Sequence, residues 1–170
     1  MILTEYCVYL PLQTETLDLI QGLRQRFDPL AELIPPHVTL VFPFKTNLEI
    51  EAILASVTEA IESFRKFHFT LGSVICSESY VFLPVVEGED EIRNLHAALY
   101  GTDLKPFRSQ VHEYSPHVTI GRYKDESEAK MILSEVKVLP LGSKGTFNRV
   151  ILESIDSKGH GILEGDWTLK

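Results

Sequence analysis

The sequence predicts an α+β fold built from two similar halves, each in the order β-α-β-α-β, with antiparallel sheets flanking a central cleft. The first observation behind this prediction is a tetrapeptide, Pro-His-Val-Thr, that occurs at 36–39 and again at 116–119. The second is that the expected strands and helices follow the same order around both copies, as an internal duplication would. The third is that the segments are short and varied, which favours an α+β sheet pair over a doubly wound parallel sheet. We therefore expect a single domain over residues 1–170 with two lobes and repeat halves of approximately 1–76 and 77–170.

Hydrophobic periodicity defines the elements of the first half. The first strand is stopped by Pro11, and the helix that follows has Thr14 as its candidate cap and ends at Pro29. The second strand opens with Pro35 and Pro36, and proline is tolerated at a strand's first residue because no ladder donor is lost there. The expected elements are strands over 6–10, 34–44 and 67–75 and helices over 17–27 and 49–66.

The second half repeats this order. Its first strand, YVFLPVV at 80–86, resembles YCVYLPL at 6–12 with an offset of 74, whereas the motif and the closing strand are offset by 80. A helix follows a turn at 88–90, and the residues 156–159 suit the turn of a final hairpin. The expected strands lie over 80–86, 117–123, 145–155 and 161–169, and a loop is expected over 105–115. One expected helix starts at 88–90, has its apolar face over 92–100 and ends before Pro106, and a second lies over 127–136.

Composition and charge exclude several functional classes. The 170-residue chain is 44% hydrophobic and has a formal net charge of −8, so it lacks the basic surface that grips long nucleic acid. Cys7 and Cys76 have neither metal nor disulfide spacing and fit a reducing compartment. The N-terminus lacks the basic region of a signal peptide, and no stretch approaches the roughly 20 apolar residues of a membrane span. We expect a cytoplasmic protein without a membrane partner; its oligomeric state stays open, with a monomer as the working expectation.

Each copy of the motif presents a histidine and a threonine on one face of a strand. Side chains alternate across a strand, so His37 and Thr39 share a face, about 6–7 Å apart along it, and His117 and Thr119 do the same. If the halves pack with pseudo-twofold symmetry, these four groups line one cleft. One imidazole can then take a proton from water while the other gives a proton to a leaving ribose oxygen. The threonine hydroxyls can donate to phosphate oxygens as their charge grows. The pattern points to acid–base chemistry at a phosphodiester, with no cofactor.

A metal site and the remaining histidines are the alternatives to this interpretation. Two histidines lack the carboxylate or cysteine that zinc usually requires, and no acidic residue lies within three positions of either one, so we expect no metal. The triplet at 68–70 is a third His-x-Thr, but the position offset by 80 is Asn148, so we interpret His68 as a sheet-surface residue. His96 lies on an apolar helix stripe and is expected to be packed. His112, which can border the site, and His160 are expected at the surface.

At the two motifs, His37-Val38-Thr39-Leu40 and His117-Val118-Thr119-Ile120, the chain resembles the 2H phosphoesterase superfamily. This group includes 2'-5' RNA ligase-like proteins, cyclic nucleotide phosphodiesterases and a branch of small bacterial phosphoesterases. The Gly121-Arg122 pair, the YVFLPV strand and the LHAALY helix are also similar to that family, and the resemblance covers nearly the whole chain. It implies a bilobal fold with a water-filled cleft.

The resemblance also implies an activity and roles for the four motif residues. The activity is metal-independent cleavage of cyclic phosphates, chiefly 2',3'-cyclic ends of RNA or small nucleotide-derived cyclic phosphates, or the reverse ligation. By this resemblance His37 is the proton donor, His117 the proton acceptor, and Thr39 and Thr119 hold the phosphate. The residues themselves leave the acid and base roles open, because the two sites look nearly alike.

Three further residues are candidate substrate contacts in a locally basic stretch, 104–124, that suits a terminal phosphate or a mononucleotide. Strand alternation places Arg122 opposite His117, so a phosphate contact requires a bulge or twist, and an outer salt bridge is an equal alternative. Tyr123 shares the face of His117 and, like Tyr114, can stack on a base, which contributes roughly 1–3 kcal/mol. Packing at the rim is the alternative for both tyrosines.

The sequence thus favours a metal-independent hydrolase acting on a small cyclic-phosphate nucleotide or an RNA terminus. Three alternatives remain. The same fold can bind a nucleotide or phosphate without turnover, it can act as a 2'-5' RNA ligase, or it can serve as a structural or interaction domain. A binding module would hold a nucleotide that stays intact. A structural or interaction domain would lose no ligand when the motif histidines are replaced.

Overall fold

The computed structural model describes residues 3–109 and 113–170, so His112 lies outside the described residues. Every pairing between named strands is antiparallel, as the sequence predicts. The elements are β1 (Thr4–Pro11), α1 (Leu17–Phe27), β2 (His37–Thr46), α2 (Ile50–Ile61), β3 (Phe67–Leu71), β4 (Ile75–Ser77), β5 (Tyr80–Glu87), α3 (Glu89–Leu99), a short 3-10 helix (Lys105–Phe107), β6 (His117–Arg122), α4 (Glu126–Val136), β7 (Lys144–Phe147), β8 (Arg149–Ile155) and β9 (Gly161–Thr168).

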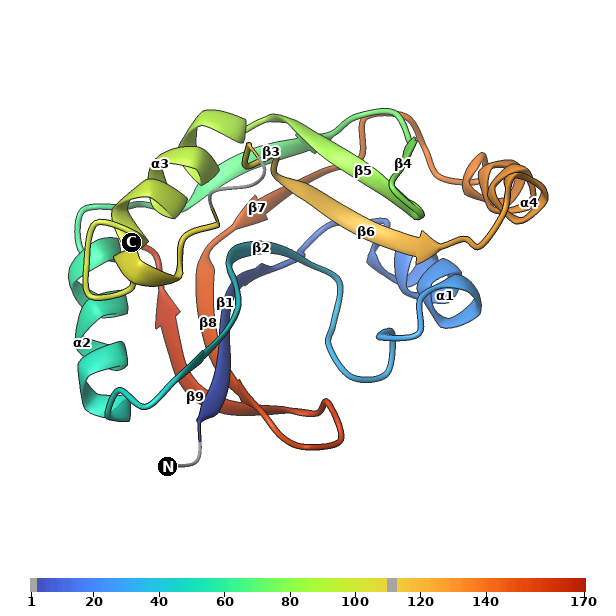
Figure 1. Ribbon diagram of the computed structural model, residues 1–170. Coiled ribbons are helices and arrows are strands. Elements are labelled where there is room, and N and C mark those ends of the chain that lie inside the picture. Colours follow the sequence, from blue (N-terminus) through green and yellow to red (C-terminus); the bar gives the residue numbers. More distant parts are fainter. Residues whose placement is uncertain (1–2, 110–112) are drawn as a thin grey trace.

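The strands form two sheets, which we name by their central strands (Figure 1). The β1 sheet has the order β2-β1-β8-β9, and the β5 sheet has the order β4-β5-β3-β7 with β6 paired to β5. The halves exchange strands, because β3 joins the β5 sheet while β8 and β9 extend the β1 sheet. The boundary between the expected repeat halves, at residues 76 and 77, therefore does not coincide with the boundary between the sheets.

The strand expected over 145–155 is in fact two strands that separate at Asn148. β7 pairs with β3 in the β5 sheet, whereas β8 pairs with β1 in the β1 sheet. The chain crosses between the sheets here, at two consecutive polar residues, Asn148 and Arg149. Likewise, the strand expected over 67–75 ends at Leu71, and a separate short strand begins at Ile75.

α1 and α2 lie inside their expected ranges, α3 begins at Glu89, within the expected helix start, and α4 begins at Glu126, one residue before its expected range. α2 ends at Ile61 rather than at residue 66, and Thr16 rather than Thr14 occupies the N-cap of α1. The Thr14 hydroxyl donates instead to the carbonyl of Lys144, at 2.6 Å, so tertiary contact overrides the local capping signal. No helix among the described residues is long and apolar enough to cross a bilayer.

Each half's first helix packs against the motif strand of the other half. α1 contacts β6, and α3 contacts β2. On the motif strands Val38, Leu40, Val118 and Ile120 are fully buried, as the alternation predicts. One hydrophobic core joins residues of both sheets. The core thereby fixes each motif strand by one face and leaves the histidine and threonine on the other.

Strand pairing corrects the offset between the two first strands. Residues 9–11 of β1 lie opposite 39–37 of β2, and residues 82–84 of β5 lie opposite 119–117 of β6. Tyr9 is therefore equivalent to Phe82, which gives an offset of 73 instead of the expected 74. The two tyrosines that suggested 74, Tyr6 and Tyr80, are not equivalent.

Candidate active site

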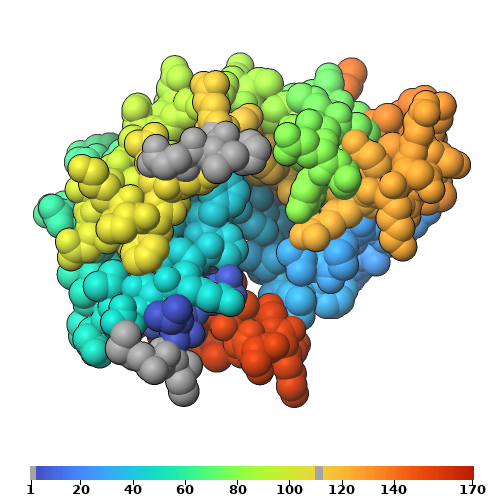
Figure 2. Space-filling view, in the orientation of Figure 1, coloured from blue at the N-terminus to red at the C-terminus, as the bar shows by residue number. Residues whose placement is uncertain are grey.

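A cavity of about 1300 Å³ is lined by residues of both sheets. The four motif side chains, His37, Thr39, His117 and Thr119, all line it. Figure 2 shows the surface hollowed on this side, above the red-orange C-terminal strands and below the green and orange layer. The structure therefore brings together the four residues that the sequence singles out.

The two motif histidines are held in the same way. His37 Nδ1 lies 2.7 Å from the carbonyl oxygen of Pro35, and His117 Nδ1 lies 2.7 Å from that of Ser115. A carbonyl oxygen only accepts hydrogen bonds, so Nδ1 carries the proton in both rings. In the neutral imidazole Nε2 is then unprotonated, which leaves it able to take a proton from a ligand or from water.

An aromatic ring packs against each imidazole from the neighbouring strand. Tyr9 lies 5.2 Å from His37 between ring centroids, and Phe82 lies 4.7 Å from His117. These two rings are equivalent under the corrected offset of 73 and stand opposite the motif threonines. The sequence analysis missed both, because the offset of 74 put them out of register.

Burial lowers the pKa of both motif histidines. The pKa of His37 falls to about 4, chiefly because burial penalises its charged form; the Pro35 carbonyl opposes this, and the charges of Arg24 and His117 lower the pKa further. Burial also lowers the pKa of His117, against the raising effect of the Ser115 carbonyl. Both imidazoles are thus neutral near pH 7 in the free site, and a bound anion would raise both pKa values by favouring the charged form.

A β-bulge follows each motif and reverses the alternation of side chains. On β5 the neighbouring residues Phe82 and Val81 pair with Thr119 and Gly121 of β6, so β6 has one extra residue, Ile120, between the two pairs. β2 has the same irregularity between Thr39 and Val41. The two residues of each bulge are consequently both buried, and the residue after the bulge returns to the cavity face.

The bulges decide where the remaining candidate residues point. Arg122 lines the cavity, and its guanidinium lies 5.0 Å from the ring centroid of Tyr80 on β5. Simple alternation was therefore wrong about its face, and the bulge that a contact would require is present. Tyr123 was expected on the face of His117, but it packs partly buried against the core. It is not among the described residues that line the cavity. Phe42 takes the place equivalent to Arg122 on β2, where it is 42% exposed.

Tyr114 lines the cavity, but its hydroxyl and its ring also contact other residues of the protein. Its hydroxyl donates to the Thr39 carbonyl at 2.6 Å, and its ring stacks on His96 at 3.6 Å and 5°. His96 is buried, as expected, and its Nδ1 lies 2.7 Å from the carbonyl of Leu40. The pair ties the segment before motif two to the strand of motif one, and His96 covers one face of the Tyr114 ring.

His68 and His160 are not among the described residues that line the cavity. His68 is exposed, and its Nδ1 lies 3.0 Å from the hydroxyl of Thr146 on the neighbouring strand. His160 is exposed in the turn before β9, with Nδ1 3.4 Å from Asp156. Within residues 3–109 and 113–170, no group of three or more His, Cys, Asp or Glu side chains is placed to hold a metal ion.

A carboxylate bound to Tyr9 was not anticipated from the sequence. The Tyr9 hydroxyl donates to Glu153 Oε1 at 2.9 Å, and Glu153 lines the cavity. A Cβ atom on Gly161 would lie 2.1 Å from the other carboxylate oxygen, so a larger residue there would require the Glu153 side chain to move. Burial and the neighbouring Glu153 raise the pKa of Tyr9 well above its usual range, which keeps its hydroxyl protonated. The pairing of β1 with β8 was the missing signal.

Comparisons with known proteins agree with this architecture. A family model described as the 2'-5' RNA ligase superfamily matches residues 10–159. A protein of Bacillus pumilus (strain SAFR-032), named "Putative phosphoesterase", is 26% identical over 155 residues, covering 89% of this chain and 86% of the relative. A protein of the same description from Bacillus mycoides (strain KBAB4) is 31% identical over 126 residues, covering 71% of each chain.

Solved structures show the same fold. E. coli LigT complexed with 3'-AMP has a TM-score of 0.70 and 16% identity, covering 99% of each chain. E. coli LigT complexed with phosphate has a TM-score of 0.65 and 19% identity, covering 100% of this chain and 99% of the other. The family match spans both motifs and most of the length. This chain therefore belongs to the 2'-5' RNA ligase superfamily, and it is a 2H phosphoesterase by family.

Proposed function

We propose that this protein opens 2',3'-cyclic or related cyclic phosphodiesters, at RNA ends or in small nucleotides, without a metal or cofactor. The observation that carries the proposal is the pair of His-x-Thr strands on one cavity, with Nδ1 of each ring bound to a backbone carbonyl. The names of the relatives, and the 3'-AMP and phosphate complexes of LigT, support a phosphate ester and a small nucleotide as ligand.

The proposed reaction uses the Nε2 atom of one histidine on the attacking water and that of the other on the leaving oxygen. Nε2 of His117 takes a proton from the water as its oxygen attacks phosphorus. The bond from phosphorus to one ribose oxygen breaks, and protonated His37 gives that oxygen its Nε2 proton. The hydroxyls of Thr39 and Thr119 donate to the non-bridging oxygens, which carry growing charge, and Arg122 adds a positive charge at the same cavity.

The anionic substrate itself supplies the protonation state that this reaction requires. In the free site burial holds the pKa of His37 at about 4, so a proton donor is scarce near pH 7. A cyclic phosphate carries one negative charge, and its approach favours the imidazolium form. The anion favours the charged form of both rings, and the family resemblance, not the pKa shifts, assigns His37 as the donor and His117 as the acceptor.

The cavity favours a short RNA terminus or a nucleotide over a bare phosphate. Its volume of about 1300 Å³ exceeds the ~300–1,000 Å³ that drug-sized ligands usually occupy. Aromatic and charged side chains line the space beyond the motifs, among them Phe42, Tyr114 and Glu153. With a net charge of −8, the chain meets the phosphate through this local site and not through its overall field.

The test is a panel of cyclic phosphates assayed in EDTA. It compares the wild type with His37→Ala and His117→Ala, and His68→Ala, from the third His-x-Thr, is the matched control. Each motif variant should lose roughly 10²–10⁴-fold in rate, as expected for a lost general acid or base, whereas the control keeps its rate. Activity that survives either motif substitution contradicts the proposal.

Product analysis separates the other functions of the same site. A nucleotide that binds tightly in calorimetry but stays intact would identify a binding module. A joined product from a 2',3'-cyclic end and a 5'-hydroxyl end would identify 2'-5' ligation. A phosphomonoester as the sole product supports the hydrolase.

A further inference from the structure

The backbone before each motif histidine is held by the same set of contacts in both halves. The carbonyl of the residue just before the histidine accepts from a backbone N–H of the neighbouring chain segment. Leu12, just after β1, donates to Pro36 at 2.9 Å, and Val85 on β5 donates to Pro116 at 3.0 Å. The carbonyl two residues before accepts from the histidine's own Nδ1. The carbonyl three residues before accepts from an arginine in both halves.

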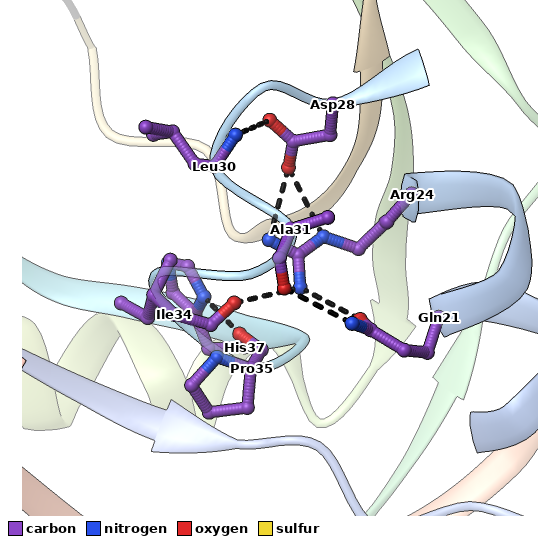
Figure 3. A network of polar contacts seen from close by, with 8 residues as sticks. All are labelled: Gln21, Arg24, Asp28, Leu30, Ala31, Ile34, Pro35 and His37. Carbon is purple, nitrogen blue, oxygen red and sulfur yellow. Dashed lines mark hydrogen bonds and ion pairs between the residues drawn. The ribbon is translucent and has the colours of Figure 1, made fainter. Parts of the chain in front are cut away.

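In the first half this arginine is Arg24, at the centre of the network in Figure 3. Its Nη1 donates to the carbonyl of Ile34 at 2.9 Å, while Nε and Nη2 donate to one carboxylate oxygen of Asp28 at 3.0 and 2.9 Å. Arg24 is 1% exposed. The other Asp28 oxygen accepts from the N–H of Leu30 at 3.0 Å. The pair thus fixes both ends of the segment that leads from α1 into His37.

In the second half an arginine uses the same three nitrogen atoms for the same kinds of contact. Nη1 of Arg93 donates to the carbonyl of Tyr114, and Nε and Nη2 donate to one carboxylate oxygen of Glu89 at 2.9 and 2.7 Å. Arg24 lies on α1 and Arg93 on α3, the first helix of each half. The carboxylate follows the arginine by one turn in the first case and precedes it by one turn in the second. The sequence pattern therefore hides the equivalence.

We propose that Arg24 and Arg93 are positioning residues, each holding the backbone before its own motif histidine so that Nε2 faces the cavity. The arginine fixes one carbonyl, and the next carbonyl along the chain is then aimed at Nδ1 of the imidazole. A guanidinium is suited to this because its planar fork binds a carboxylate on one edge and a carbonyl with the remaining nitrogen. The consequence for catalysis rests on the proposed function, but the effect of the arginines on the orientation of the two imidazole rings does not.

The two arginines differ in burial, so their effects should differ in size. Arg24 is almost fully enclosed, whereas the Arg93 side chain is 35% exposed and water can replace part of its contact. Loss of Arg24 should therefore disturb His37 more than loss of Arg93 disturbs His117. Each effect stays within its own half, because neither arginine contacts the backbone before the other histidine in the part of the chain that the structure describes.

The test is long-range ¹H–¹⁵N NMR of the histidine side chains in the full-length protein, because the ring ¹⁵N shifts report which nitrogen carries the proton. The variants are Arg93→Met and the pair Arg24→Met with Asp28→Asn; the asparagine avoids a buried, unpaired carboxylate and keeps an acceptor for the Leu30 N–H. Arg26→Met is the matched control, since Arg26 also lies on α1 but pairs with Glu135 at the surface.

In the wild type and the control, both rings should show a single tautomer with the proton on Nδ1. The Arg24 variant should give His37 a second tautomer and leave His117 unchanged, and Arg93→Met should do the reverse with a smaller effect. In the cyclic phosphate assay kcat should fall by about tenfold or more, with a much smaller change in KM, because misorientation acts on the chemical step. Folded variants whose own histidine keeps one tautomer overturn the inference. A wild type that opens no cyclic phosphate overturns the proposed function and leaves this result intact.

Discussion

Each motif histidine has one nitrogen for chemistry, because a backbone carbonyl two residues earlier binds the other. Both pKa values are lowered by burial, that of His37 to about 4. At the scale of single residues the site therefore holds two imidazoles that are neutral near pH 7, and the proposed function requires a bound anion to favour the protonated form of one of them.

The pH profile of kcat/KM follows from these shifts, since kcat/KM reports the pKa values of the free protein. One histidine must be protonated and the other neutral, and both pKa values lie below the usual 6.5. We expect a bell-shaped profile with its maximum on the acid side of pH 6.5. Rates at subsaturating substrate between pH 4 and 9 would measure it. A profile that is flat from pH 5 to 8 speaks against paired acid–base work, provided that chemistry limits the rate.

Stability should also depend on pH through His37. Its pKa is near 6.5 in the unfolded chain and about 4 in the folded protein, so between these values the unfolded state binds more protons. The free energy of unfolding should therefore fall as the pH drops from 6.5 towards 4, by on the order of 1–3 kcal/mol from this group. Urea unfolding at several pH values, compared with His37→Asn, checks the slope. If the free energy of unfolding of His37→Asn depends on pH with the same slope, a group other than His37 causes the dependence.

At the scale of elements, the bulges after the motifs determine which side chains reach the cavity. Gly121 occupies one bulge, and a Cβ there would lie 2.7 Å from Cβ of Phe27 and 3.0 Å from its carbonyl oxygen. The glycine thus permits the close approach of α1 to β6, which keeps Arg122 on the cavity side. Leu40 and Val41 form the equivalent bulge on β2, which presents Phe42.

Gly121→Ala should accordingly destabilise the protein by about 1–3 kcal/mol, because the backbone of α1 must move to admit a methyl group. Gly22→Ala is the matched control, since a Cβ at Gly22 meets nothing within 4 Å and alanine favours a helix interior. Thermal or urea unfolding of both variants measures the difference. Equal stabilities for the two would show that the contact between α1 and β6 is not tight.

The comparison of sequence with structure is clearest at the same scale. The motif strands, the main helices and the four cavity groups follow from alternation and repetition in the sequence. The faces of Arg122 and Tyr123 do not, because one extra residue in a bulge reverses the alternation without changing the hydrophobic pattern. The aromatic partners of the histidines and the carboxylate of Glu153 depend on which strands pair, and strand pairing is a tertiary property.

At the scale of the whole molecule, the exchange of strands joins the two halves into one folding unit. β8 and β9 complete the sheet that holds motif one, and β3 completes the sheet beside motif two. α1 and α3 also cross to the opposite motif strand. Neither half therefore has a complete sheet of its own, and the cavity exists only when both are folded.

Unfolding should consequently be a single cooperative transition. Trp167 on β9 reports the β1 sheet by fluorescence, and far-ultraviolet circular dichroism reports all elements. We expect the two denaturant curves to have the same midpoint and to fit one free energy. Two separated transitions would mean that the lobes fold independently.

We propose that His37 is the proton donor and His117 the proton acceptor, and a change of leaving group separates these two roles. A proton donor matters for a ribose oxygen but hardly for p-nitrophenolate, which leaves without a proton. The measurement is kcat for a nucleoside 2',3'-cyclic phosphate and for a p-nitrophenyl ester of a nucleoside phosphate, in EDTA. The account predicts that His37→Ala loses the first activity and keeps most of the second, whereas His117→Ala loses both. If His117→Ala, rather than His37→Ala, kept its activity on the p-nitrophenyl ester, the assigned roles would be contradicted. Full activity of either variant on the cyclic phosphate would contradict the paired mechanism itself.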